Sequence, residues 1–301
     1  MINSVTVTNH LGESLTIEMA NPDPSGLAIR SIEGLGPGKG TVSILERAGM
    51  DGALYTSARL NSRNIVISFI YLSYPYAQTA RLKTYQYFPI KKKITLEIAT
   101  TTRTVKIDGY VESNEPDIFS EQSGGTISIV CPDAYFYDVN DTVIDFSSVT
   151  PNFEFPVSNE SLVVGLLEFG LLDNNTIANV LYGGDSEVGV VIEILASGPA
   201  NNVSLVEYRS GNTLFIDSTI LASYTGSDIT TGDRIVISTV KGNKYAHLIR
   251  GGQTYNILNT LGYFPPWFLL YSGDNRYAYD ADSGLANLTF RFSYSVAYEG
   301  V

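Results

Sequence analysis

The sequence predicts a mostly β protein of two domains, with the division near residue 138. Tyrosine occurs 20 times, and serine, threonine and asparagine are common, a composition typical of sheets rather than helices. Apolar and polar residues alternate over many short segments, and this period of two marks strands with one buried face. A chain of 301 residues is long enough for two domains, each with its own core. The predicted boundaries are residues 1–138 and 139–301.

The first domain is predicted to contain short strands, one long hairpin and one helix. The segment from Gly34 to Leu60 begins with several glycines and carries the turn Asp51-Gly52, so we interpret it as a long exposed hairpin or loop. A helix is expected from Pro75 to Phe88, because Pro75 suits a first helical turn and Pro89 ends the helix. The expected strands are Ser4–Thr8, Ser14–Met19, Leu27–Glu33, Val42–Arg47, Leu54–Leu60 and Arg63–Leu72.

Three further strands are predicted between Lys91 and Asp138. They are Ile94–Ala99, Thr104–Ser113 and Gly125–Cys131, and each alternates apolar and polar residues. The pattern stops at Pro132, which ends the last strand. Cys131 is the only cysteine of the chain, so an intrachain disulfide is excluded and we expect a buried packing residue.

The second domain is predicted to be a β-sandwich. Phe146–Phe155 is interpreted as a linker, and about ten short strands without a helix are expected after it. The last of them, Leu288–Tyr298, is expected either to close the sandwich or to return to the first domain. The others include Leu162–Phe169, Glu187–Ala196, Val203–Arg209, Asn212–Asp217, Arg234–Thr239, Tyr245–Leu248 and Phe268–Tyr271.

The charge and the hydropathy pattern restrict the environments that the protein suits. The net charge is −12, which argues against an outer surface that binds nucleic acid but allows a channel through which DNA passes. The first residues lack a basic region followed by an apolar one, so no signal peptide is expected. No apolar run approaches the roughly 20 residues of a membrane span, so we expect a protein made in a cytoplasm and not inserted in a membrane.

The sequence predicts no catalytic, cofactor or metal site, and hence no enzyme. Gly34–Thr41 resembles a phosphate-binding loop but places glycine after Lys39 where serine or threonine is needed. Asp280–Gly284 resembles the start of a calcium loop, but the twelfth position is Arg291 instead of glutamate, so an exposed turn is expected. Two histidines and one cysteine make no zinc set. What remains is an assembly or binding protein.

An ordered set of short motifs resembles the distal tail protein (Dit) family of long-tailed siphophages. The resemblance covers nearly the whole chain, and the family commonly has proline where this chain has Ala134. The motifs are Ile32-Glu-Gly-Leu35, Glu46-Arg-Ala-Gly-Met-Asp-Gly52, Ser62-Arg-Asn-Ile-Val-Ile67, Phe88-Pro89, Ile107-Asp-Gly-Tyr-Val-Glu-Ser113, Ile129-Val-Cys-Pro-Asp-Ala-Tyr-Phe-Tyr137, Thr231-Gly-Asp-Arg-Ile-Val-Ile237, Trp267-Phe-Leu-Leu-Tyr-Ser-Gly-Asp-Asn275 and Phe292-Ser-Tyr-Ser-Val-Ala-Tyr-Glu-Gly-Val301.

The resemblance implies a structural hub of the baseplate at the tail tip of a phage or prophage, assembled in the bacterial cytoplasm. It implies an N-terminal domain related to the tail tube protein that closes into a hexameric ring, followed by a galectin-like sandwich. The ring would join the tail tube protein to the tail-associated protein, and receptor-binding or side-fibre proteins would dock on the sandwich for host adhesion. DNA would cross the central channel without specific binding, and an acidic lumen would ease its transit.

Two sets of site residues follow from these interpretations. The hairpin would clasp the neighbouring subunit through Leu35, Val42, Ile44, Met50, Leu54 and Tyr55. The alternative function is a carbohydrate-binding host-recognition sandwich, with Trp267 and Tyr263 as the glycan or partner surface. The galectin pattern of a tryptophan followed by glycine is absent, because Phe268 follows Trp267.

Overall fold

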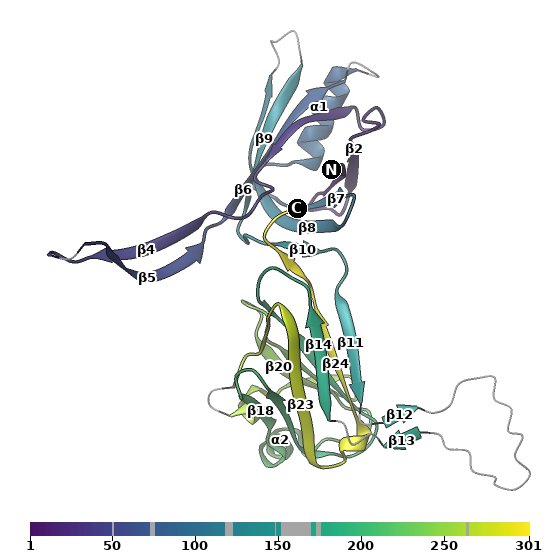
Figure 1. The fold of residues 1–301 in the computed structure, drawn as a ribbon. Coiled ribbons are helices and arrows are strands. Elements are labelled where there is room, and N and C mark those ends of the chain that lie inside the picture. Colours follow the sequence, from purple (N-terminus) through teal and green to yellow (C-terminus); the bar gives the residue numbers. More distant parts are fainter. Residues whose placement is uncertain are drawn as a thin grey trace, which may run out of the picture. The chain divides into compact units, whose positions relative to one another are not determined.

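The computed structural model describes residues 1–49, 51–72, 76–117, 123–147, 149–151, 170–172, 176–262 and 265–301. Its chain divides into two compact units (Figure 1). The N-terminal unit comprises Met1–Asn140 together with Ala297–Val301, and the C-terminal unit comprises Asp141–Val296. Ala297–Val301, where the chain re-enters the N-terminal unit, is named the return segment. None of the described helices is long and apolar enough to cross a bilayer.

The N-terminal unit is built on a nine-stranded antiparallel sheet. Its main path runs in the order β2-β1-β7-β8-β9-β6-β3, with β10 paired to β8 and β25 paired to β10. The strand bounds are β1 (Ile2–Thr8), β2 (Ser14–Glu18), β3 (Leu27–Glu33), β6 (Arg63–Tyr71), β7 (Lys93–Thr100), β8 (Thr104–Asp117), β9 (Gly124–Cys131), β10 (Phe136–Asp138) and β25 (Ala297–Tyr298). The predicted strands of this domain are confirmed, and β8 continues four residues beyond the predicted end at Ser113.

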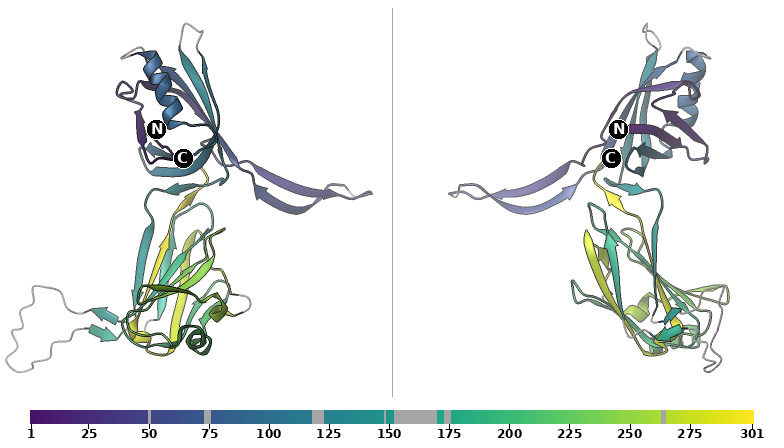
Figure 2. Two further views of the ribbon diagram at one scale, coloured as in Figure 1. Left: turned by 180° about the vertical axis from the view of Figure 1, so that it is seen from behind. Right: turned by 45° about the vertical axis from the view of Figure 1, so that its right-hand side comes forward.

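One face of this sheet carries the core of the unit. Helix α1 (Ala77–Tyr87) lies against that face and buries Ala80 and Thr84 (Figures 1 and 2). The predicted helix is confirmed over these residues, while Pro75 lies outside the described residues. The core side chains come from alternate strand positions: Val5, Val7, Ile17, Leu27, Ile65, Ile67, Phe69, Tyr71, Ile94, Leu96, Ile98, Val105, Ile107, Val111, Ile127, Ile129, Cys131 and Phe136. Cys131 is fully buried as predicted, and burial raises the pKa of its thiol to about 12.

The C-terminal unit is a sandwich of two antiparallel sheets. The larger sheet has the order β11-β24-β16-β19-β20-β21 and the smaller β14-β23-β17-β18, with the small pairs β12-β13 and β15-β22 beside them. Aromatic rings from β24 pack on rings from β23, with centroids 5.1 Å apart for Phe292 and Tyr277 and 4.8 Å for Phe290 and Tyr279. These contacts across the two sheets form the core of the predicted sandwich.

The strands of the C-terminal unit agree only in part with those predicted for the second domain. The predicted last strand is divided: Leu288–Tyr294 belongs to the sandwich, and Ala297–Tyr298 returns to the N-terminal unit. Predicted strand Leu162–Phe169 lies outside the described residues. The strands are β11 (Thr142–Ser147), β12 (Val149–Pro151), β13 (Gly170–Leu172), β14 (Ile177–Tyr182), β15 (Val188–Gly189), β16 (Val191–Ala196), β17 (Asn201–Glu207), β18 (Thr213–Ile216), β19 (Arg234–Ser238), β20 (Tyr245–Arg250), β21 (Gln253–Asn256), β22 (Leu269–Leu270), β23 (Gly273–Ser283) and β24 (Leu288–Tyr294).

Three predictions for this unit are wrong. It contains helix α2 (Ser218–Thr225), which local capping creates: Asp217 accepts from the first amides and Gly226 ends the helix with φ +82°. The start of the expected linker, Phe146, lies in β11, where its ring contacts Phe292. Asp280–Ser283 continues β23 instead of forming a turn, because β23 pairs along its length with β14 and β17. Two short 3₁₀ segments, Leu258–Leu261 and Leu285–Asn287, complete the unit.

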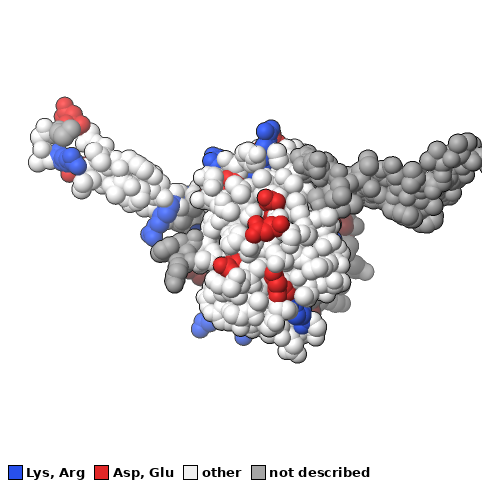
Figure 3. Space-filling view, turned by 90° about the horizontal axis from the view of Figure 1, so that it is seen from below, with Lys and Arg blue, Asp and Glu red and all other residues white. Residues whose placement is uncertain are grey.

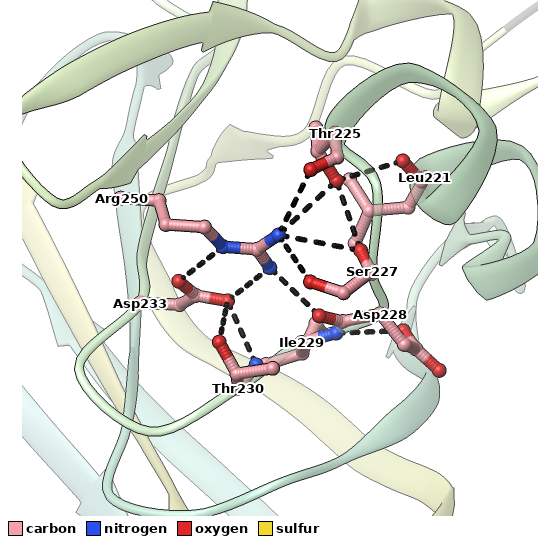
Figure 4. Close-up of polar contacts among 8 residues, drawn as sticks. All are labelled: Leu221, Thr225, Ser227, Asp228, Ile229, Thr230, Asp233 and Arg250. Carbon is pink, nitrogen blue, oxygen red and sulfur yellow. Dashed lines mark hydrogen bonds and ion pairs between the residues drawn. The ribbon is translucent and has the colours of Figure 1, made fainter.

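A buried ion pair holds the loop before β19 in the C-terminal unit (Figure 4). Arg250 donates to both carboxylate oxygens of Asp233, from Nε at 2.8 Å and from Nη2 at 2.5 Å. The remaining guanidinium hydrogens bond Ser227 Oγ at 2.7 Å and the Asp228 carbonyl oxygen at 2.7 Å. Asp233 belongs to the Thr231–Ile237 motif, and its side chain is almost inaccessible to solvent. The motif therefore has a structural role: it holds the loop between α2 and β19 against β20.

This ion pair predicts that the C-terminal unit loses stability in acid. Burial alone raises the pKa of Asp233, but the hydrogen bonds from Arg250 and Thr230 outweigh it and the pKa lies below its ordinary value. The stabilisation is therefore present above the unfolded pKa of about 3.9 and is lost as the pH falls through the folded pKa. We expect urea unfolding monitored by Trp267 fluorescence to show a loss on the order of 1 kcal/mol between pH 6 and pH 3.

Two substitutions distinguish the contribution of Asp233 to the pH dependence of stability from that of other carboxylates. Asp233→Asn is expected to reduce the loss of stability between pH 6 and pH 3, because the titrating group is gone. Asp145→Asn is the matched control, since Asp145 forms a similar bidentate pair with Arg291 at 2.7 and 2.9 Å but both side chains are solvent-exposed. An equal effect of the two substitutions on the pH dependence would contradict the assignment.

Candidate interaction hairpin

Strands β4 (Gly40–Glu46) and β5 (Ala53–Leu60) form a hairpin that pairs with no other described strand. It joins β3 to β6, and Figures 1 and 2 show it as a two-stranded ribbon distinct from the sheet. Every residue of both strands is exposed. At its base the Asn61 amide donates to the Lys39 carbonyl oxygen at 3.0 Å, and Thr41 Oγ1 donates to Asn61 Oδ1 at 3.0 Å.

One face of the hairpin is apolar in its middle part, between the pair Gly40–Leu60 at the base and the pair Glu46–Ala53 near the tip. Val42 is paired with Ala58, and Ile44 with Tyr55, and directly opposed residues share a face of an antiparallel pair. Val42 and Ile44 are each 59% exposed, and Tyr55 is 63% exposed. We name these four residues the apolar face of the hairpin.

The opposite face changes character between base and tip. Near the base it carries the pairs Thr41–Arg59 and Ser43–Ser57, whereas Leu45 pairs with Leu54 closer to the tip. A register shift between Ser43 and Ile44 separates the polar part from the apolar part. The two leucines are about half exposed.

Such a hairpin is unstable when water surrounds both of its faces. Isolated two-stranded hairpins are marginal in water, and a contiguous exposed apolar surface is typical of an interaction site. The strand residues carry only two charges, Glu46 and Arg59, so charge does little to keep other chains away from these edges. The hairpin therefore has the chemistry of a segment that becomes buried against a partner.

Arg63, the first residue of β6, ties the base of the hairpin together. Its Nη1 donates to the carbonyl oxygens of Gly34, at 2.6 Å, and Gly36 on the entry side of the hairpin. Both Nε and Nη2 donate to the Ala134 carbonyl oxygen, at 2.9 and 2.7 Å. Nη2 also donates to the Glu299 carbonyl oxygen at 2.7 Å. One side chain thus joins three segments that are distant in the sequence.

The charge of Arg63 is held by dipoles of the main chain. The side chain is buried, with 5% of the residue exposed, and all five of these hydrogen bonds end on main-chain carbonyl oxygens. The guanidinium carbon also lies 4.5 Å from the centroid of the Phe136 ring. Burial lowers the pKa of Arg63, yet an arginine remains charged at any pH at which the protein is folded.

The structure places most of the predicted clasp residues on the hairpin. Val42, Ile44, Leu54 and Tyr55 lie on it and are exposed, whereas Leu35 precedes it and packs, partly buried, against the core of the N-terminal unit. Met50 lies outside the described residues. Sequence reasoning missed Leu45, which the pairing with Leu54 reveals, and Arg63, for which the sequence holds no signal because its partners are main-chain atoms.

The predicted glycan or partner surface is only partly described. Trp267 is partly buried, and the Lys244 ammonium lies 5.2 Å from the centroid of its ring. Tyr263 lies outside the described residues. Among the described residues, no group of three or more histidine, cysteine, aspartate or glutamate side chains could hold a metal ion. Carbohydrate binding at Trp267 stays a prediction, and a glycan array with the purified protein is its test.

The two-unit β architecture of the chain has a counterpart among the solved structures of phage proteins. No protein-family model matches the chain, and no curated protein matches it either. Among solved structures, the chain is similar to the Dit protein (gp 19.1) of phage SPP1, which is described as a paradigm of the hub adsorption apparatus in phages that infect Gram-positive bacteria. The TM-score is 0.64 at 12% identity, and the match covers 97% of this chain and 98% of that one.

Two structures of the phage P2 baseplate in its activated conformation are more distantly similar. The one with calcium has a TM-score of 0.47 at 12% identity, covering 97% of this chain and 98% of that one. The one with strontium has a TM-score of 0.44 at 11% identity, covering 97% of each chain. The resemblance to distal tail proteins that the sequence predicts is thus confirmed at the level of the fold, through the SPP1 protein.

Proposed function

We propose that the protein is a Dit-like hub of a phage baseplate, whose N-terminal units close into a hexameric ring through their hairpins. The observation that carries the proposal is a hairpin with an exposed apolar face on a chain that shares the fold of SPP1 Dit over nearly its whole length. A hairpin that leaves one subunit and binds the next makes a heterologous contact, and such contacts generate rings when the rotation closes.

The ring would join the tail tube protein to the tail-associated protein at the tip of the virion tail, with receptor-binding or side-fibre proteins as further partners. DNA would pass through the ring without specific binding. The net charge of −12 supports this. Figure 3 adds an observation on the C-terminal unit alone, where acidic side chains gather near the middle of the visible face. Such a surface offers no basic patch to a phosphate backbone.

Deletion of the hairpin tests the proposal. Replacing Gly40–Leu60 by two glycines should preserve the fold, because the Asn61 amide and the Lys39 carbonyl oxygen already lie 3.0 Å apart at the base. We expect the intact chain to form rings in negative stain and hexamers by light scattering, and the deleted chain to remain a monomer. Protection of the buried Cys131 thiol from labelling verifies the folded state. Hexamers that persist after the deletion would refute the clasp.

A further inference from the structure

The return segment closes the base of the hairpin. Its strand β25 pairs with β10, with Tyr298 opposite Phe136 and Ala297 opposite Tyr137. The return segment follows the C-terminal unit in the sequence but belongs to the N-terminal unit.

Three hydrogen bonds fasten the end of this segment. The Glu299 carbonyl oxygen accepts from Arg63 Nη2 at 2.7 Å, and the Gly300 carbonyl oxygen accepts from Arg103 Nη2 at 2.8 Å. The Val301 amide donates to the Leu35 carbonyl oxygen at 3.0 Å. The Arg103 guanidinium also stacks 4.3 Å from the centroid of the Tyr298 ring. One of these bonds therefore ends directly on the connection between β3 and β4, through which the chain enters the hairpin.

The return segment also packs tightly against that connection between β3 and β4. A Cβ atom placed on Gly300 would lie 3.1 Å from the Leu35 carbonyl oxygen and 3.4 Å from the Gly36 carbonyl carbon. Arg63 bonds Gly36 and Glu299 with the same guanidinium, so the connection that enters the hairpin and the return segment are held by one group.

Small movements at this base have large effects at the tip. Seven residues of strand are about 23 Å long at roughly 3.3 Å per residue, so a rotation of about 10° at the base moves the tip by about 4 Å. Contacts between apolar side chains weaken when a gap of about 1 Å opens. A hairpin that pairs with no other described strand can meet a partner surface reproducibly only if its base is fixed.

We propose that the return segment is a latch that fixes the direction of the hairpin, with Arg63 and Arg103 as the positioning residues through which it acts. Displacement of Glu299–Val301 removes the bonds to Arg63, Arg103 and Leu35 together. The connection between β3 and β4 then loses its bond from Val301 and keeps those from Arg63 to Gly34 and Gly36. The latch thus couples the position of residues 297–301 to the direction of the hairpin. The proposal rests on the proposed function only for the use of the hairpin, because its mobility is measured in the monomer.

The test compares the intact chain with a chain that ends at Tyr298. A spin label on Ser57→Cys reports the hairpin, since Ser57 lies on its polar part and the native Cys131 is buried. At concentrations where both chains are monomers, we expect the label to be more mobile in the shortened chain. The Asn61 amide, which is bonded to Lys39, should exchange its hydrogen about tenfold faster.

Two arginine substitutions complete the experiment. Arg103→Gln removes the Gly300 bond and the stacking on Tyr298, and we expect a smaller increase in mobility of the same kind. Arg59→Gln is the matched control, because Arg59 is exposed on β5, and it should leave the Asn61 amide unchanged. Equal label mobility and Asn61 exchange in the intact and shortened chains overturn the latch. If the shortened chain does not fold, the Arg103→Gln result decides, and an unchanged hairpin there overturns it. If the hairpin of the intact chain is ordered but the protein forms no rings, the proposed function is contradicted and the latch is not.

Discussion

Replacing Arg63 with methionine is expected to lower the free energy of unfolding of the N-terminal unit by about 3–5 kcal/mol. Methionine fills part of the same volume but donates no hydrogen bond, so the carbonyl oxygens of Gly34, Gly36, Ala134 and Glu299 lose a charged donor in a buried place. Hydrogen bonds to charged groups contribute about 1.5–3 kcal/mol each, and the loss is partly offset because no buried charge remains.

The two units need separate reporters for this measurement, and the chain supplies one in each. Cys131 is the only cysteine and is buried in the N-terminal unit, while Trp267 is the only tryptophan and lies in the C-terminal unit. Labelling of the thiol against urea concentration follows the first unit, and tryptophan fluorescence follows the second. We expect Arg63→Met to shift only the thiol transition.

Two further substitutions at arginine positions sharpen this result. Arg63→Lys keeps the charge but loses the planar fork, so it should retain only part of the stability. Arg59→Met, at an exposed position of β5, should change the stability by less than about 0.5 kcal/mol. A loss below about 1 kcal/mol for Arg63→Met would show that the five bonds contribute little beyond what water offers the same groups.

Replacing Ile44 with aspartate should abolish self-association of the folded protein. Ile44 lies at the middle of the apolar face of the hairpin, opposite Tyr55, and is 59% exposed within its own chain. A carboxylate buried there against a neighbouring subunit would be unpaired, and central interface residues of this kind commonly account for about 2–4 kcal/mol of binding. We expect an association constant at least about 100-fold lower, measured by analytical ultracentrifugation over a range of concentrations.

The neighbouring residue supplies the control for this substitution. Ser43→Asp adds the same charge one position earlier, on the polar part of the opposite face. It should weaken association by less than about tenfold, which is about 1.4 kcal/mol. Equal effects of Ser43→Asp and Ile44→Asp would mean that charge on the hairpin, and not burial of its apolar face, controls assembly. If the Ile44→Asp variant associates as strongly as the unmodified protein, the hairpin is not part of the interface.

Much of the fold could be predicted because strands with one buried face leave a period of two in the sequence. Ile94–Ala99 and Gly125–Cys131 are strands of the N-terminal sheet, and their apolar positions are those that the structure buries. β23 is not among the strands named from the sequence, because polar residues interrupt its alternation: it contains four aspartates and asparagines between Gly273 and Ser283. α2 was missed because capping by Asp217 and Gly226 creates a helix that its own residues barely favour.

The candidate site divides in the same way. The apolar residues of the hairpin are visible in the sequence, but the sequence alone treats Leu35 and Val42 alike. The structure separates them, since Leu35 packs against the core while Val42 is 59% exposed. Burial is a property of the whole fold, so a pattern shows that a side chain is apolar and does not show what covers it.

By itself, the sequence determined a β-rich chain and a resemblance to distal tail proteins, and it predicted two domains and a long exposed hairpin or loop in the first. Local alternation, turn residues and composition were enough for these, because they depend on neighbours in the chain. The tertiary structure decided that Arg63 holds Gly34, Ala134 and Glu299 at one point and that the return segment reaches the hairpin base. Main-chain carbonyl oxygens are the same at every residue, so no sequence pattern marks those that a buried guanidinium selects.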